Sequence, residues 1–343
     1  MTKRIGFACK WINDPSEVDG MKINAKDRNL NTGSTTVAWL GRQTREVAEQ
    51  KLWDLMAGNI EAVRKLVERV GTLDEHLRMV RISSDILPVY TQRDWSYFWR
   101  RTDVVAYCER HFAQIGQIAR DRNVRLSFHP GQFTVLASVN EGIVERSIEE
   151  FEYHADMARW MGFGRRFQDY KINVHISGKQ GPEGVRKAYK RLSPEARNCI
   201  TIENEENSWG LEDCLELGDI LPIVMDVHHN WIREGEYIQP SDDRVKRVVD
   251  SWRGVRPVMH YSCSREDVLV DHCPNTLPNY KLLLEQGYKK QKMRAHSNFY
   301  WNRPANEWAL QFLETHDIMS ESKGKNLASF ALAEQARELG IIS

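Results

Sequence analysis

The sequence lacks any long apolar run. No stretch approaches the roughly 20 consecutive apolar residues that a membrane-spanning helix needs. It also lacks an apolar segment of the secretory type near its start, because MTKRIGFACKW leads directly into a strand-like pattern. We therefore expect a cytoplasmic protein with no membrane partner.

The sequence also has no excess of charge and no closely paired cysteines. It contains 48 Lys+Arg against 48 Asp+Glu, which argues against a surface that binds polyanions over its whole extent but leaves room for a local basic groove. The six cysteines are scattered and form no CxxC pair, which favours reduced thiols in a core over a disulfide framework. What is present is 41% apolar residues, enough for a sizeable core.

Short β-rich runs alternate along the chain with amphipathic helical patterns, which is typical of βα units around a parallel sheet. Eight such runs favour a closed (β/α)8 TIM barrel over an open doubly wound sheet. We find no internal repeat, low-complexity tract or composition break, and we predict that residues 1–343 form a single domain. The expected strands are 4–9, 78–84, 124–129, 170–176, 199–204, 222–228, 256–262 and 317–321, and the clearest helices are 43–70, 103–122, 142–161, 241–253 and 304–315.

Two connections are longer than ordinary barrel loops, residues 10–42 and residues 263–303. Long loops in compact domains usually carry function or are disordered. Two segments combine cations with aromatic residues, namely RDWSYFWRR at 93–101 and YKKQKMRAHSNFYWNR at 288–303. This combination is typical of contact with a nucleic-acid backbone and its bases, although each segment could equally be a packing helix with a solvated face.

Six of the eight predicted strands end in a side chain that can bind a divalent metal. One such His is more often a core residue than a ligand, but six together are hard to explain as core residues. The C-terminal ends of barrel strands meet on one face, where active sites lie, so these side chains should converge. Imidazoles and carboxylates without thiolates suit Zn, Mn or Fe, and Glu203 in the middle of the series is placed to bridge two ions. The residues are His129, His175, Glu203, Asp226 with His228 and His229, His260 and Glu321.

At these residues the sequence resembles the UV damage endonuclease family, a relative of the endonuclease IV type of apurinic-site nucleases. No single motif is specific, but their order along the chain is. The matching stretches are RISSDILP (81–88), FHPGQFTVL (128–136), NVHISG (173–178), TIENEE (201–206), MDVHHN (225–230), MHYS (259–262), RAHSN (294–298) and MSESKGK (319–325), with a weaker echo in RIGFAC.

The resemblance implies a cluster of divalent ions, with Mn²⁺ as the first expectation and Zn²⁺ or Mg²⁺ as alternatives. Glu203 would bridge two firmly bound ions, and Glu203, His229 and His296 would have catalytic roles. The implied ligands are Asp226, His260 and Glu321 for one ion, His129 and His175 for the other, and His229 and His296 for a third.

The resemblance also implies residues that contact the DNA and detect the lesion. Gln132 and Phe133, after the HPG turn, match a pair that probes the lesion from within the duplex, although the family more often has Tyr at the second position. Phe7 matches another aromatic residue that faces the lesion. The implied partner is damaged double-stranded DNA, bound by a monomer that in a bacterium would accompany the nucleoid.

The sequence departs from the family at two positions near the third ion. The family carries a Lys, described in carboxylated form at the metals, two residues before the His of the seventh strand, where this chain has Val258. The segment 89–101 contains none of the His residues that the family tends to have there. We therefore expect the third ion to be held weakly, and we regard His272 as a further candidate ligand.

Three functions remain open at this point. The first is a nuclease that hydrolyses the backbone on the 5′ side of pyrimidine dimers and 6-4 products, and of apurinic sites, with metal-activated water. The second is a xylose-isomerase-like sugar isomerase or epimerase, which would need a catalytic Lys and a closed pocket. The third is a sensor that binds lesions without cutting. The long basic and aromatic loops favour the nuclease.

Overall fold

The protein is described here by a computed structural model that covers residues 2–18 and 29–343. Part of the connection 10–42 therefore lies outside the described residues. The eight strands form one parallel sheet in the order β6-β5-β4-β3-β2-β1-β8-β7. They are β1 (Ile5–Cys9), β2 (Met79–Ile82), β3 (Arg125–Phe128), β4 (Lys171–His175), β5 (Ile200–Glu203), β6 (Ile223–Val224), β7 (Val258–Tyr261) and β8 (Asp317–Ser320).

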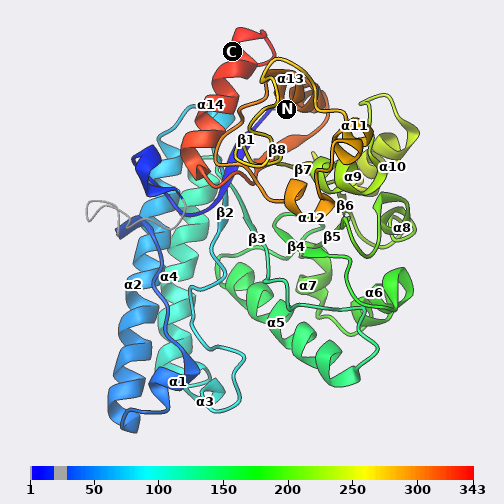
Figure 1. The fold of residues 1–343 in the computed structure, drawn as a ribbon. Coiled ribbons are helices and arrows are strands. Elements are labelled where there is room, and N and C mark those ends of the chain that lie inside the picture. The colour runs from blue at the N-terminus through cyan, green and yellow to red at the C-terminus, as the bar shows by residue number, and fades with distance from the viewer. Residues whose placement is uncertain (1, 19–28) are drawn as a thin grey trace.

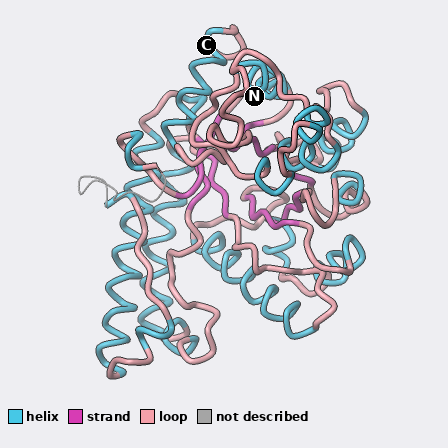
Figure 2. Tube along the Cα trace, viewed as in Figure 1, coloured by secondary structure: helices cyan, strands magenta, loops and turns pink. Residues whose placement is uncertain are grey.

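The sheet closes on itself between its two outer strands. A parallel bridge joins Asp226 to His260 just beyond β6, and the amide of His260 donates to the carbonyl of Met225 at 3.0 Å. The predicted TIM barrel is therefore confirmed, with the strands surrounded by helices as Figures 1 and 2 show.

Helices cover the outside of the barrel, and the predicted helices 43–70, 103–122 and 142–161 are found at almost the expected bounds. None of the described helices is long and apolar enough to cross a membrane. The helices are α1 (Val37–Leu40), α2 (Arg45–Gly71), α3 (Ser96–Trp99), α4 (Thr102–Asp121), α5 (Glu141–Trp160), α6 (Gly181–Tyr189), α7 (Pro194–Cys199), α8 (Leu211–Leu215), α9 (Val227–Glu234), α10 (Asp243–Ser251), α11 (Tyr280–Glu285), α12 (Lys290–Met293), α13 (Arg303–Leu310) and α14 (Lys325–Glu338).

Helix α2 shows why these segments are helical. Thr44 caps its first turn by accepting a hydrogen bond from the amide of Val47, which satisfies one of the amides that a helix start leaves unpaired. Its buried residues recur at helical spacing and include Leu52, Met56 and Val63. This apolar stripe packs against α4, which runs beside α2 in Figure 1.

The sixth strand is shorter than the prediction of 222–228. The carboxylate of Asp226 accepts a hydrogen bond from the amide of His229 at 2.7 Å and so caps α9, which begins at Val227. An Asp at this position ends a strand because it offers the backbone a helical start instead. As a consequence, Asp226 lies at the strand end, and His228 and His229 lie on the first turn of a helix.

A buried carboxylate joins several strands at the opposite end of the barrel. Asp317 begins β8 with no exposed surface and pairs with Arg125 at 2.7 Å, with Arg256 at 2.7 Å and with Arg4 at 3.8 Å. Since these residues start or precede β1, β3, β7 and β8, the network joins strands that are distant in sequence.

Candidate metal centre

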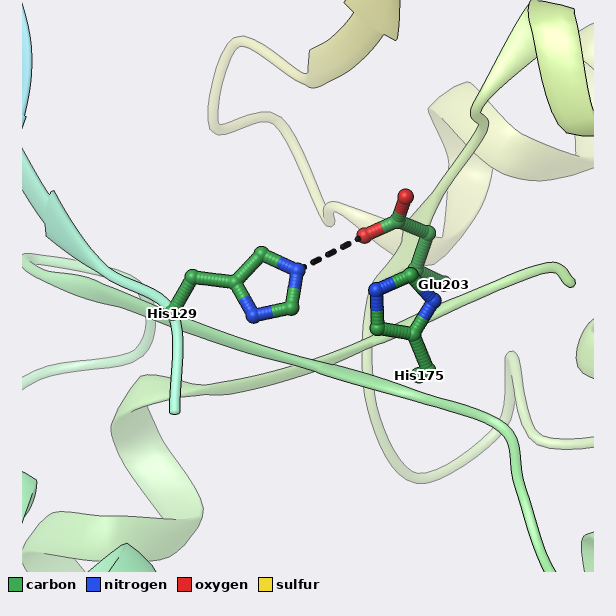
Figure 3. Close-up of side chains that lie close together, drawn as sticks. All are labelled: His129, His175 and Glu203. Atoms are coloured by element: carbon green, nitrogen blue, oxygen red, sulfur yellow. Dashed lines mark ion pairs between the residues drawn. The ribbon is translucent and has the colours of Figure 1, made fainter. Parts of the chain in front are cut away.

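The potential ligands come together where the strands end. The described residues contain three compact groups in which one ligand atom of each residue lies within 4.8 Å of the others. Figure 3 shows one of these groups, with the ring of His129 pointing toward the carboxylate of Glu203 beside His175. The groups are His129, His175 and Glu203; His129, His260 and Glu321; and Glu203, Asp226, His260 and Glu321.

Glu203 is the centre of this arrangement. Its Oε2 atom lies 3.3 Å from Nε2 of His129 and 3.1 Å from Nδ1 of His260. Nδ1 of His260 also lies 3.2 Å from Oε1 of Glu321. Asn173 donates a short hydrogen bond to Oε2 of Glu203 from the neighbouring strand, which fixes the carboxylate in place.

The donor atoms are arranged in a way that suits the binding of divalent ions better than hydrogen bonding with one another. Oε1 of Glu203, Oδ2 of Asp226, and Nδ1 of His175 and of His260 are buried and have no hydrogen-bond partner among the described residues. An unsatisfied buried polar atom costs about 1–3 kcal/mol, so four at one point need an explanation. Nitrogen and oxygen donors that face one another without hydrogen-bond geometry match a cation that would lie between them.

The three carboxylates differ in how far neighbouring charges offset the effect of burial on the pKa. Burial by itself raises the pKa of Glu203, but the imidazoles of His260 and His175 outweigh it and hold that pKa well below its usual range. In the same way, Arg81 and His260 outweigh burial and keep the pKa of Glu321 low. Burial raises the pKa of Asp226 to about 8. Two carboxylates are therefore ionised, as ligation of a cation requires.

The imidazoles of the inner groups favour the neutral form that binds metals. Burial lowers the pKa of His129, His175 and His260. His229 behaves differently: burial lowers its pKa, but Asp226, Glu203 and Glu206 together raise it to about 9. The field around His229 therefore favours a positive charge there.

His229 and His296 lie further out than the other predicted ligands. Among the described residues, neither belongs to a compact ligand group. Their ring centroids are 6.4 Å apart, against 4.9 Å for His129 and His175. Nδ1 of His229 lies 3.0 Å from the carbonyl of Asn204, and Nδ1 of His296 lies 3.0 Å from the carbonyl of Glu321.

The comparison with known protein families decides what this barrel is. The model of the family described as UV-endonuclease UvdE matches residues 4–343. The chain belongs to this family. The resemblance expected from the motifs is thereby confirmed.

The chain is also similar to individual UvdE relatives. It is 26% identical to a UV-damage endonuclease of Schizosaccharomyces pombe, over 97% of this chain and 50% of that protein, so it spans about half the length of that relative. It is 24% identical to a UV DNA damage endonuclease of Bacillus cereus, over 88% of this chain and 87% of that protein. The crystal structure of SacUVDE matches with a TM-score of 0.70 and 21% identity, over 98% of this chain and 99% of that one, and shares the fold.

Three charged or polar residues near the candidate ligands did not stand out in the sequence. Arg81 donates a short hydrogen bond to Glu321. Lys171, whose pKa burial lowers to about 7, places Nζ 3.1 Å from Nε2 of His260. Lys171 and Asn173 precede His175 at two-residue spacing on β4, so alternation along the strand is the signal that could have found them.

Val258 occupies the position where the family carries Lys. It is buried in an apolar cluster with Met79 and Met319, so its side chain offers no donor atom to a metal. The amine that lies beside His260 comes instead from Lys171, on a different strand.

Of the three residues expected to meet the lesion, two are accessible. Gln132 and Phe133 follow β3 on the surface, and Phe133 is 85% exposed. Phe133 lines a groove of about 640 Å³ together with Arg93 and Arg146. Phe7, by contrast, is fully buried and packs edge-on against Trp11. The structure therefore does not place Phe7 where it could face the DNA, because its side chain lies in the core cluster that also contains Leu52 and Met56 of α2.

The two basic and aromatic segments are only partly what the sequence suggested. Trp95, Phe98 and Trp99 are buried, and Tyr300 is buried with its hydroxyl bonded to Ser320. These aromatic rings stabilise the loops and cannot stack on bases in this structure. The cations of the second segment differ from these buried rings, because Lys289, Lys292 and Arg294 are exposed. His272 lies apart from the ligand groups, with Nε2 2.9 Å from the carbonyl of Thr276.

Proposed function

We propose that this chain is a metal-dependent endodeoxyribonuclease that cuts the DNA backbone 5′ to UV photoproducts, both pyrimidine dimers and 6-4 products, and to apurinic sites. The observation that carries the proposal is the convergence of Glu203, Asp226, His260 and Glu321 at the strand ends of a UvdE-family barrel. The names of the relatives support the substrate class, and the arrangement of the candidate ligands supports metal-dependent hydrolysis.

The centre would hold divalent ions, with Mn²⁺ as the first candidate and Zn²⁺ or Mg²⁺ as alternatives. Two such ions would stabilise the charge that develops on a phosphodiester and make water a stronger nucleophile at neutral pH. Glu203 would bridge them, since both of its oxygens face other donor groups. His129 and His175 would complete one position, and Asp226, His260 and Glu321 would complete the other.

The remaining residues would bind and orient the substrate. An exposed Phe133 beside Gln132 can enter a duplex where damage has already weakened the base stack, which lowers the few kcal/mol that opening requires. Exposed cations such as Lys289 and Lys292 would contact phosphates and make binding salt-sensitive. In this proposal the protein acts as a cytoplasmic monomer on double-stranded DNA, and residues 1–343 form one domain.

One experiment tests the proposal. The metal-stripped protein is reloaded with Mn²⁺ and incubated with an end-labelled duplex, either UV-irradiated or untreated, and the cuts are mapped. We expect cuts 5′ to the photoproducts, only in irradiated DNA and only with metal, and a parallel apurinic duplex tests the second substrate. Lesion binding without cuts under any divalent ion would indicate a sensor, and turnover of a sugar without DNA cleavage would indicate an isomerase.

A further inference from the structure

A buried carboxylate lies beside His229 that belongs neither to the ligands expected from the sequence nor to the compact ligand groups. The side chain of Glu206 is 7% exposed, and its Oε2 atom lies 3.7 Å from Nε2 of His229. We propose that Glu206 is a ligand of a third divalent ion, which it holds together with His229 and His296. This inference deepens the proposed metal centre and rests on it.

The carboxylate of Glu206 is held with one oxygen turned toward His229. Its Oε1 atom accepts a hydrogen bond from Nδ2 of Asn207 at 2.8 Å and forms an ion pair with Nη1 of Arg294 at 2.9 Å. These two groups occupy Oε1 and leave Oε2 on the side of His229. Outer contacts of this kind orient the ligating atom of a metal site and fix its direction.

The two imidazoles are oriented by the same principle. A neutral imidazole that donates its Nδ1 hydrogen to a carbonyl carries its lone pair on Nε2. The carbonyls of Asn204 and Glu321 accept from Nδ1 of His229 and of His296, each at 3.0 Å. In the neutral form the lone pair on each Nε2 is available to an ion. In His229, whose surroundings favour a positive charge, that atom faces Glu206.

The proposed site is more open than the inner ones. The rings of His229 and His296 are 6.4 Å apart, so an ion must draw its ligands inward, which costs free energy that the compact groups do not spend. Three protein ligands, one of them a carboxylate, nevertheless bind a divalent ion more strongly than two imidazoles and water. The third ion should thus bind, and more weakly than the first two.

A carboxylate ligand at the third ion would also offset the two positions at which this chain lacks a ligand of the family. With Val258 in place of Lys and no His in 89–101, the sequence left only two imidazoles for the third ion. Glu206 restores a negatively charged ligand from a different loop. His272 is not required for this role.

Counting bound Mn²⁺ tests the inference without DNA. The full chain is stripped of metal and titrated with Mn²⁺ while free Mn²⁺ is followed by electron paramagnetic resonance. We expect three equivalents, the third weaker, and in Glu206→Gln a loss of at least about tenfold in the affinity of the third alone. Glu205→Gln is the matched control, because the Glu205 carboxylate bonds Ser208 instead, and it should bind like the original chain.

Two results would overturn the inference: saturation of the original chain at two equivalents, or unchanged third-ion binding in Glu206→Gln. Circular dichroism checks the fold, and if Glu206→Gln does not fold, Glu206→Asp, which keeps the charge with a shorter reach, must weaken the third ion instead. A chain that binds three ions and cuts no damaged DNA would keep this inference and end the nuclease proposal.

Discussion

Oε2 of Glu203 lies 3.3 Å from Nε2 of His129, although the two residues belong to different strand ends of the barrel. The same oxygen lies 3.1 Å from Nδ1 of His260. Oε1 is buried without a hydrogen-bond partner among the described residues. One side chain therefore faces ligand atoms from several strands, and its loss should disturb the centre more than the loss of any other ligand.

Replacement of Glu203 by Gln should abolish incision while the fold remains. The amide keeps the shape but removes the charge that would hold two ions together, so we expect a loss of at least about 100-fold in the cutting rate. Incision of irradiated duplex measures the effect, with circular dichroism as the check on folding and Glu205→Gln as the control. Near-normal cutting by a metal-replete Glu203→Gln protein would end the bridging proposal.

Lesion recognition should depend on Gln132 and Phe133 more than metal binding does. Both residues are exposed, and neither belongs to a ligand group of the described residues. Replacing both with Ala removes the ring that would fill the opened stack, worth about 1–3 kcal/mol per base. Competition binding should show about a tenfold or larger fall in preference for damaged over intact duplex, with unchanged Mn²⁺ content. Retained preference would place the probing elsewhere.

The network at the bottom of the barrel should matter for stability and not for chemistry. Asp317→Asn leaves Arg125 and Arg256 without their buried partner, and breaking such a pair costs about 3–5 kcal/mol. Urea unfolding measures this loss. Glu314→Gln is the control, because the Glu314 side chain is 79% exposed in its pair with Lys3 and its loss should change stability very little. Equal effects of the two changes would contradict the prediction.

The sequence predicted the barrel because strand and helix periodicity are local properties, and it placed His129, His175 and Glu203 because strand ends converge in any barrel. It could not separate the exposed Phe133 from the buried Trp99, since both are aromatic residues in polar surroundings. That difference depends on which segments pack above each ring.

The sequence also could not predict side-chain contacts between segments that are far apart in the chain. In the sequence, nothing distinguishes Arg81 and Lys171 from other cations. In the closed barrel, Arg81 lies beside Glu321 and Lys171 lies beside His260. Glu206 stands in a run of acidic residues, and only the packing of Arg294 against it shows which oxygen faces His229. The bounds of β6 depended on a cap: the carboxylate of Asp226 begins a helix where apolar periodicity predicted further strand.

His154 should make the protein less stable in acid. It is fully buried on α5, and burial lowers the pKa of its imidazole from 6.5 to about 4, although the carbonyl of Glu150 accepts its Nδ1 hydrogen. Between these two pH values the unfolded chain binds a proton that the folded chain does not. The stability that this residue contributes is therefore complete above about pH 6.5 and is lost as the pH falls toward 4, by about 3 kcal/mol in all.

His154→Asn tests this linkage, because the amide can still donate to the carbonyl of Glu150 but does not titrate. The variant should be less stable than the original chain at pH 7, where it has lost the packing of the ring against Phe128 and Tyr153. The difference in the free energy of unfolding should then shrink by about 2–3 kcal/mol between pH 7 and pH 4.5, because only the original chain loses this contribution. Urea unfolding at a series of pH values measures it. A difference that stays constant with pH would show that His154 takes up its proton as easily inside the folded protein as outside it.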